Sequence, residues 1–302
     1  MPSLRRLAAG PDRVVAAVSQ PDRPRGRGRK RSASPVAAEA ERLGIAALRT
    51  ESVGEPAFVA ELAALEPDLG VVVAFGQFLP RRVRELPRTG YLINAHASLL
   101  PRHRGAAPIA RAILAGDTET GISVMRVERE MDAGAVALVR RTSIASDETA
   151  GELEARLAEI AADAILAAVA GVAADRIVWT AQDDALASFA PKIGPDEARL
   201  DWSEPADALV RRVRALSPRP GAFASFAGER LRILRASALP TSGDTDLPGT
   251  VRLAPLRIAT GDGWLAPRVL QRAGGKPLDA EDFQRGRGLP DGARLGADEA
   301  GG

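Results

Sequence analysis

The sequence predicts an α/β protein of two domains, an open parallel sheet with helices followed by a small β-barrel. The length of 302 residues exceeds the usual size of one domain. In the first half, short β-branched runs alternate with longer amphipathic runs, as in an open α/β sheet. Short strand-like pieces separated by turn residues follow in the second half, which suits a barrel. We therefore expect a first domain over 1–181, a linker over 182–204 and a second domain over 205–302.

The first domain is expected to begin with a helix, because Leu4, Leu7 and Ala8 have helical spacing before Gly10-Pro11. Runs of β-branched residues predict strands over 14–19, 70–75, 91–95, 121–127 and 135–139. Apolar positions three or four apart predict helices over 36–43, 56–65, 106–115 and 150–170. In such a sheet, functional residues gather at the carboxyl ends of the strands.

The second domain is expected after an irregular linker rich in Asp, Pro and Gly. A helical pattern over 205–216 precedes strand-like pieces over 224–226, 230–236, 250–251, 256–260 and 263–270. The Gly-rich tail over 286–302 is expected to fray at its end.

The composition limits the classes of function. The chain has no cysteine and only two histidines, which argues against disulfides and against a zinc site. A hydrophobic content of 45% with a formal net charge of +2 is typical of a folded protein. No apolar run approaches the roughly 20 residues of a membrane span, and the N-terminus does not resemble a signal peptide. We expect a cytoplasmic monomer with no metal and no membrane partner.

Three polar residues are candidates for one site. If 91–95 is a strand, Asn94 and His96 point to the same face at its end. Asp132 follows the next strand in a tight Met-Asp-Ala-Gly loop, where a carboxylate could orient His96 and favour its charged form. Asn94 and His96 could donate hydrogen bonds to an oxyanion while Asp132 accepts a proton, which suits acyl transfer. The spacing equally allows a turn-closing Asn, a buried structural His and a turn-starting Asp.

The stretch over 94–108 resembles the signature of the 10-formyltetrahydrofolate-dependent formyltransferases, and the resemblance extends through 116–121 and 131–134. It implies that Asn94, His96 and Asp132 are catalytic and that 10-formyltetrahydrofolate is the co-substrate, with no metal. It also implies a folate site lined by Ser98, Leu99, Leu100 and Pro101. His103 stands where the family usually carries Trp or Tyr.

A basic cluster bears on the acceptor of the formyl group. Six cations crowd into nine residues: Arg23, Arg25, Arg27, Arg29, Lys30 and Arg31. Alternating Arg with Gly and Pro makes a cationic strap suited to phosphate contacts, although an isolated run of this kind is commonly a solvated loop without a partner. The run resembles the loop that members of the family acting on methionyl-tRNA place against the acceptor stem.

The second half resembles the same branch of the family, at 190–193, 200–202, 214–222 and 274–278. This resemblance implies a Rossmann-like open parallel sheet followed by an OB-like barrel that binds tRNA, with Lys192 among the tRNA contacts. The implied activity is transfer of a formyl group to the α-amino group of methionine on initiator tRNA, for translation initiation. Two alternatives stay open: a formyltransferase acting on a small amine such as a sugar nucleotide, and a tRNA-binding protein without turnover.

The beginning of the chain departs from the family, whose members open with a hydrophobic strand and a Gly-containing loop. Residues 2–4 match the helix that follows those elements. In the family that strand is central, so its neighbours would each have an unpaired edge, at about 1 to 3 kcal/mol per buried polar group. We expect that the natural protein is longer by this strand, or that the sheet rearranges.

Overall fold

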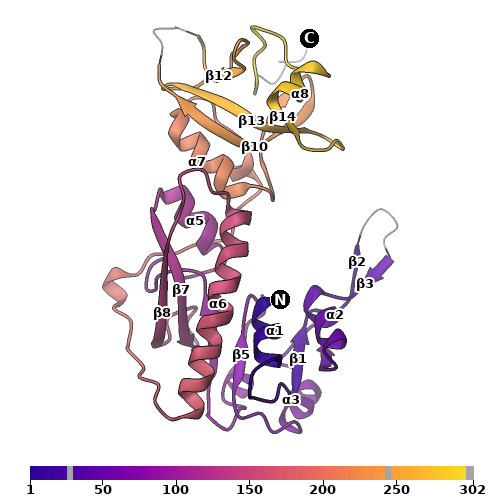
Figure 1. Ribbon diagram of the computed structural model, residues 1–302, viewed down its shortest axis with the longest axis vertical. Coiled ribbons are helices and arrows are strands. Elements are labelled where there is room, and N and C mark those ends of the chain that lie inside the picture. The colour runs from indigo at the N-terminus through magenta and orange to yellow at the C-terminus, as the bar shows by residue number, and fades with distance from the viewer. Residues whose placement is uncertain (26–29, 242–245, 297–302) are drawn as a thin grey trace. The chain divides into compact units, whose positions relative to one another are not determined.

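The computed structural model describes residues 1–25, 30–241 and 246–296 (Figure 1). The chain divides into two compact units that interleave along the sequence. The N-terminal unit contains residues 1–105, 120–142 and 155–189. The C-terminal unit contains residues 106–119, 143–154 and 190–302.

The helices of the N-terminal unit begin where proline or a cap residue favours a helix start. Ser34 caps α2, because its Oγ accepts the backbone N–H of Ala37 at 3.0 Å. A capping box starts the long helix α6: the Thr149 N–H donates to Glu152 Oε2 at 2.9 Å, and the Glu152 N–H donates to Thr149 Oγ1 at 3.4 Å. The helices are α1 (Pro2–Ala8), α2 (Pro35–Arg42), α3 (Pro56–Ala63), α4 (Arg81–Arg84) and, shared with the C-terminal unit, α6 (Ala150–Ala173).

The five strands expected in the first half are present, with ends shifted by a few residues: β1 (Ala16–Ser19), β5 (Gly70–Val72), β6 (Leu92–His96), β7 (Glu119–Arg126) and β8 (Val136–Ser143). β4 (Ala46–Arg49) has no β-branched residue and was not predicted. The hairpin of β2 (Arg23–Arg25) and β3 (Lys30–Ser32) was also not predicted. The α/β class is confirmed.

The sheet is parallel in part. β1 pairs with β4 and β5 pairs with β6 in parallel, as expected. β7 runs antiparallel to β6, with His96 opposite Ser123. The reason is that the connection after β6 returns to the sheet at the same end, so the chain reverses instead of crossing over.

The strands form two separate ladders, β1-β4 and β5-β6-β7-β8, besides the hairpin β2-β3. Within the described residues, β1 pairs only with β4, and β5 pairs only with β6. Val18 of β1 and Val72 of β5 nevertheless pack against one apolar cluster that contains Phe58 and Leu92. Shared apolar packing therefore holds the two ladders together, without a hydrogen-bonded strand between them.

The C-terminal unit is a helix-covered antiparallel sheet, in agreement with the predicted change of pattern. Its strands run in the order β11-β12-β13-β10-β9, with β14 paired to β13. The elements are α5 (Pro108–Ala115), α7 (Ala206–Leu216), β9 (Ala222–Phe226), β10 (Glu229–Leu239), β11 (Val251–Arg252), β12 (Arg257–Ala259), β13 (Trp264–Arg272), β14 (Leu278–Asp279) and α8 (Ala280–Arg285). Leu209, Leu231 and Ile258 lie fully buried in its core. β14 and α8 were not predicted.

No helix in the described ranges is both long and apolar enough to cross a membrane.

Candidate active site

The candidate site lies at the carboxyl end of β6, and every residue placed in it belongs to the N-terminal unit. His96 ends this strand and is only 6% exposed. Its Nε2 lies 2.8 Å from the backbone oxygen of His103, and its Nδ1 lies 3.5 Å from Asp132 Oδ2. Both ring nitrogens therefore face acceptors.

Asp132 lies in the loop between β7 and β8 with φ of +54°, in the left-handed region that is uncommon for residues other than glycine but that aspartate adopts more readily than most. Its Oδ2 accepts the backbone N–H of Gly105 at 2.9 Å, in addition to facing His96. Gly134 completes the loop, because a Cβ there would lie 2.0 Å from the backbone oxygen of Arg126. The close approach of this loop to β7 therefore requires glycine at position 134.

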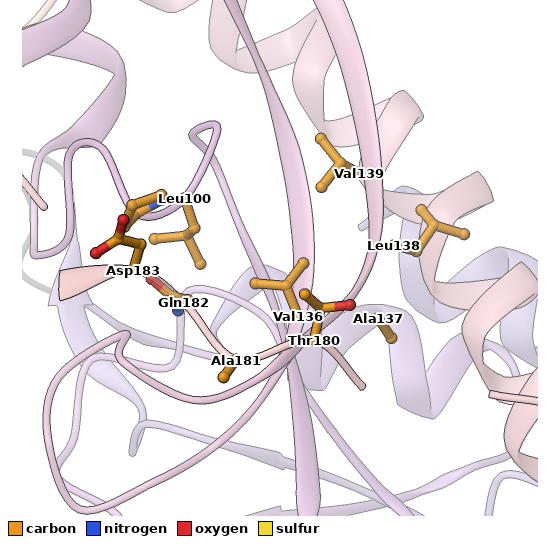
Figure 2. Close-up of a pocket in the computed structure, with 10 residues that line it drawn as sticks. Leu100, Val136, Ala137, Leu138, Val139, Thr180, Ala181, Gln182 and Asp183 are labelled. Atoms are coloured by element: carbon orange, nitrogen blue, oxygen red, sulfur yellow. The ribbon is translucent and has the colours of Figure 1, made fainter. Parts of the chain in front are cut away.

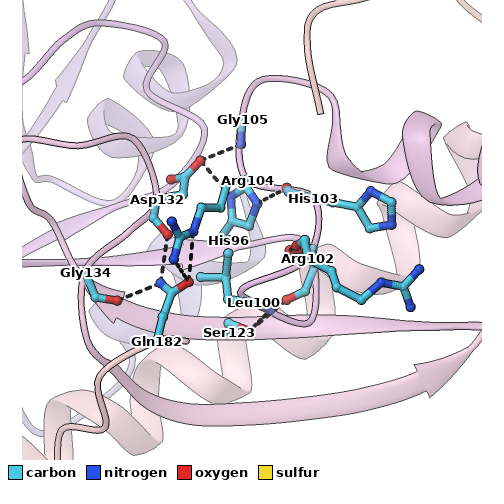
Figure 3. Close-up of polar contacts among 11 residues, drawn as sticks. His96, Leu100, Arg102, His103, Arg104, Gly105, Ser123, Asp132, Gly134 and Gln182 are labelled. Atoms are coloured by element: carbon cyan, nitrogen blue, oxygen red, sulfur yellow. Dashed lines mark hydrogen bonds and ion pairs between the residues drawn. The ribbon is translucent and has the colours of Figure 1, made fainter. Parts of the chain in front are cut away.

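The loop after β6 is folded by serine hydrogen bonds. Ser98 Oγ donates to the backbone oxygen of Arg102 at 2.6 Å, which closes a turn. Ser123 Oγ on β7 donates to the backbone oxygen of Ser98 at 2.8 Å and accepts the Leu100 N–H at 3.1 Å. These bonds fix the turn that carries the His103 carbonyl to His96, as Figure 3 shows.

Arg104 and Gln182 also belong to the site, although neither was predicted to have a role. Arg104 is 5% exposed, and its Nε and Nη2 donate to Gln182 Oε1 at 3.0 and 2.8 Å. Gln182 Nε2 donates to the backbone oxygens of Asp132 at 2.8 Å and Gly134 at 2.7 Å. Figure 3 shows the Gln182 amide between Arg104 and the Asp132 loop. The available signal was that Arg104 belongs to the signature stretch, whereas nothing in the linker marked Gln182.

Asn94 lies two residues before His96 in β6, so the strand pleat directs both side chains to one face, as predicted. Asn94 is half-buried. Its amide has no hydrogen-bond partner within the described part of the chain. The amide is therefore available to a bound molecule.

The four residues predicted to line a folate site divide into two groups. Leu100 and Pro101 line a cavity of about 320 Å³, together with residues 136–139 and 180–183 (Figure 2). Ser98 is fully buried and uses its hydroxyl within the turn. Leu99 packs beside Gly121, where a Cβ would lie 2.6 Å from its Cδ2. The cavity touches the polar site through Gln182.

The predicted basic residues are only partly described. Arg23 and Arg31 are exposed on the β2-β3 hairpin, and each makes one long hydrogen bond of 3.4 Å, to Gln20 Oε1 and to the Asp22 backbone oxygen respectively. Arg25 and Lys30 are backbone partners in that hairpin. Arg27 and Arg29 lie outside the described residues. Lys192 is exposed in the C-terminal unit.

Comparison with known proteins defines the class of this site. Residues 5–169 match the formyl transferase family model, and residues 192–288 match the model of the formyl transferase C-terminal domain. The chain belongs to the formyl transferase family.

The curated relatives identify a branch of the family. The methionyl-tRNA formyltransferase of Pseudomonas syringae pv. syringae (strain B728a) is 46% identical over 287 residues, covering 94% of this chain and 90% of the relative. The methionyl-tRNA formyltransferase of Rhodopseudomonas palustris (strain BisB18) is 43% identical over 293 residues, covering 96% and 93%.

Solved structures share the fold at low sequence identity. The sugar 3N-formyl transferase WlaRD matches with a TM-score of 0.64 at 13% identity, covering 91% of this chain and 94% of that one. HypX from Aquifex aeolicus, in complex with tetrahydrofolic acid, matches with a TM-score of 0.59 at 20% identity. That match covers 82% of this chain and 43% of HypX, so this chain spans less than half of that protein.

Proposed function

We propose that this enzyme transfers the formyl group of 10-formyltetrahydrofolate to the α-amino group of methionine on initiator tRNA. The observation that carries the chemistry is that Asn94 and His96 share one face of β6 at its carboxyl end, with Asp132 Oδ2 3.5 Å from His96 Nδ1. The choice of methionyl-tRNA is supported by the relatives of that name, which are 43–46% identical over 90% or more of their length. We further propose that it acts in the cytoplasm as a monomer.

The site contains donors for an oxyanion and an acceptor for a proton. The neutral amine attacks the formyl carbon, and the resulting oxyanion receives a hydrogen bond from the free amide of Asn94. We propose that His96, held against Asp132 and acting in its protonated form, stabilises the same negative charge. Asp132 accepts the proton that the attacking nitrogen loses. The bond from the formyl carbon to the folate nitrogen then breaks, and that nitrogen takes up the proton that Asp132 accepted.

The cavity at Leu100 and Pro101 supports a folate site. Its volume of about 320 Å³ lies at the lower end of the range for small-molecule sites. Leu100, Val136 and Leu138 give it apolar walls that suit a flat aromatic ring, and Gln182 and Asp183 give it a polar rim. We propose that Ser98 and Leu99 support this loop from below, while Leu100 and Pro101 contact the co-substrate.

The basic hairpin supports binding of tRNA. Arg23 and Arg31 are exposed with weak internal partners, which leaves their guanidinium groups available to phosphates. We propose that the other four cations of the strap contact the same tRNA phosphates, and that Lys192 also contacts the tRNA.

The test is formyl transfer by the purified protein, with radioactive formyl label on the co-substrate. Initiator methionyl-tRNA is compared with an amino-sugar nucleotide. We expect labelled formyl-methionyl-tRNA, and we expect uncharged tRNA to inhibit. Labelled sugar without labelled tRNA would assign the chain to small-amine chemistry. Binding of tRNA with no transfer to either acceptor would assign it to a binding role.

A further inference from the structure

We propose that Gln182 is a positioning residue for Asp132, holding the loop of that carboxylate in place through its side-chain amide. This inference rests on the proposed function, in which Asp132 accepts a proton. Gln182 lies outside the signature stretch over 94–108, and 50 residues after Asp132 in the chain.

The Gln182 amide has no hydrogen-bonding capacity left over. Its two N–H groups go to the backbone oxygens of Asp132 and Gly134, at 2.8 and 2.7 Å. The oxygen accepts from Nε and Nη2 of Arg104, at 3.0 and 2.8 Å. A primary amide offers two donors and two lone pairs, so all four are used. The positive charge of Arg104 also polarises the amide, which strengthens the two bonds to the loop.

These bonds close a ring of contacts around Asp132. Gly105, directly after Arg104, donates its N–H to Asp132 Oδ2 at 2.9 Å. The Arg104 segment therefore holds the carboxylate through Gly105 and the loop backbone through Gln182. The segment is itself fixed, because the Arg104 N–H donates to the Ser188 backbone oxygen at 2.8 Å.

The loop needs such a restraint because of its backbone conformation. Asp132 has φ of +54°, a left-handed conformation that is less common than the extended and helical ones even for aspartate, so contacts to this turn help to hold it. The two carbonyls that Gln182 binds, of Asp132 and Gly134, lie on either side of Ala133 in this loop. Without the amide, the turn can relax to an ordinary conformation, and the carboxylate then leaves its place 3.5 Å from His96 Nδ1. Glutamine is thus required for its donors as well as its acceptor.

Two substitutions distinguish the role of the Gln182 N–H donors from that of its oxygen acceptor. Gln182→Met keeps the approximate size and removes all four bonds, whereas Gln182→Glu keeps an acceptor for Arg104 and removes the donors. We expect both variants to lower kcat about 10- to 100-fold, with the KM for methionyl-tRNA within about threefold of wild type. Gln284→Met is the matched control, because Gln284 also uses both ends of its amide on backbone, at Leu289, but lies in the C-terminal unit.

The decisive measurement is a double-mutant cycle with Asp132→Asn. If Gln182 acts through Asp132, Gln182→Met should lower kcat by less than about threefold in the Asp132→Asn background. Independent, multiplicative losses would overturn the inference. So would a full kcat in Gln182→Glu, or a lowered melting temperature with unchanged kcat per folded molecule.

The same cycle separates this inference from the proposed function. A slow Asp132→Asn enzyme beside a fully active Gln182→Met enzyme would overturn the positioning role alone. A fully active Asp132→Asn enzyme would overturn both the catalytic role of Asp132 and the need to position it.

Discussion

Replacing Gly134 with alanine tests whether the position of the Asp132 loop controls the reaction. The added Cβ would lie 2.0 Å from the backbone oxygen of Arg126 and 2.9 Å from its carbonyl carbon, whereas ordinary contacts begin near 3.4 Å. Both atoms belong to backbone, so the loop itself must move, by about 1 Å or more. That movement also strains the hydrogen bond from the Arg126 N–H to the Ala135 backbone oxygen, which measures 2.9 Å.

The size of the effect follows from this displacement. A misplacement of about 1 Å in a catalytic group costs on the order of 100-fold in rate, equivalent to about 2.7 kcal/mol of transition-state stabilisation. The overpacked loop should also lower the free energy of unfolding by about 1 to 3 kcal/mol. Steady-state formylation of methionyl-tRNA measures the first quantity, and urea unfolding measures the second.

The matched control is Gly171→Ala in helix α6, where the nearest atoms to an added Cβ lie 3.8 Å away. This variant should keep its activity and gain a few tenths to about 1 kcal/mol of stability from helix propensity. A Gly134→Ala enzyme that folds and turns over within about threefold of wild type would refute the argument, because catalysis would then tolerate a displaced Asp132.

Three further predictions concern the pair of His96 and Asp132, the basic hairpin and the buried carboxylate of Glu39. The double variant of His96→Ala and Asp132→Ala should lose far less kcat/KM than the product of the two single losses, because an imidazole ring without its carboxylate has already lost its orientation. A double loss equal to that product would show that the two residues have separate roles. Arg31→Ala should raise the KM for methionyl-tRNA and reduce the slope of log KM against log salt concentration by about 1, with folate binding unchanged. An unchanged KM for methionyl-tRNA would show that Arg31 does not contact the tRNA. The Arg42 and Arg5 guanidinium groups lower the pKa of Glu39 from 4.5 to about 2, so this carboxylate should stabilise the fold above pH 4.5 and lose that effect as the pH falls toward 2. Urea unfolding of Glu39→Gln should therefore show a deficit against wild type at pH 7 that closes in acid, and a deficit constant with pH would contradict this assignment.

The local sequence pattern was sufficient to predict most of the strands and helices of the fold. Strands such as β6 and β7 combine β-branched residues with burial, so propensity and tertiary packing favour the same structure. β4 was missed because its Ala-Ala-Leu-Arg sequence has weak strand propensity and forms a strand through its parallel pairing with β1. The reversed direction of β7 was also missed, since the length of a connection does not state at which end of the sheet it returns.

The site was predictable where its residues share one motif. Asn94 and His96 are two residues apart in one strand, so their common face follows from the pleat. The meeting of His96 and Asp132 depended on strand order, and the resemblance supplied it. Gln182 could not be found in this way, because its role arises from contacts with backbone carbonyls, which leave no pattern of side-chain types along the chain.

The replacement at position 103 is explained by the atom that contacts His96. The family usually carries Trp or Tyr there, so His103 alters a side chain next to the site. The contact with His96 Nε2 comes from the backbone oxygen of His103, at 2.8 Å, and the His103 N–H donates to Ser188 Oγ at 2.9 Å. The backbone oxygen and N–H of residue 103 can therefore make these two contacts with a different side chain at this position, provided that φ stays near +58°. Because Ser188 and Gln182 lie in the same linker, the segment that fixes the acceptor for His96 also fixes the loop of Asp132.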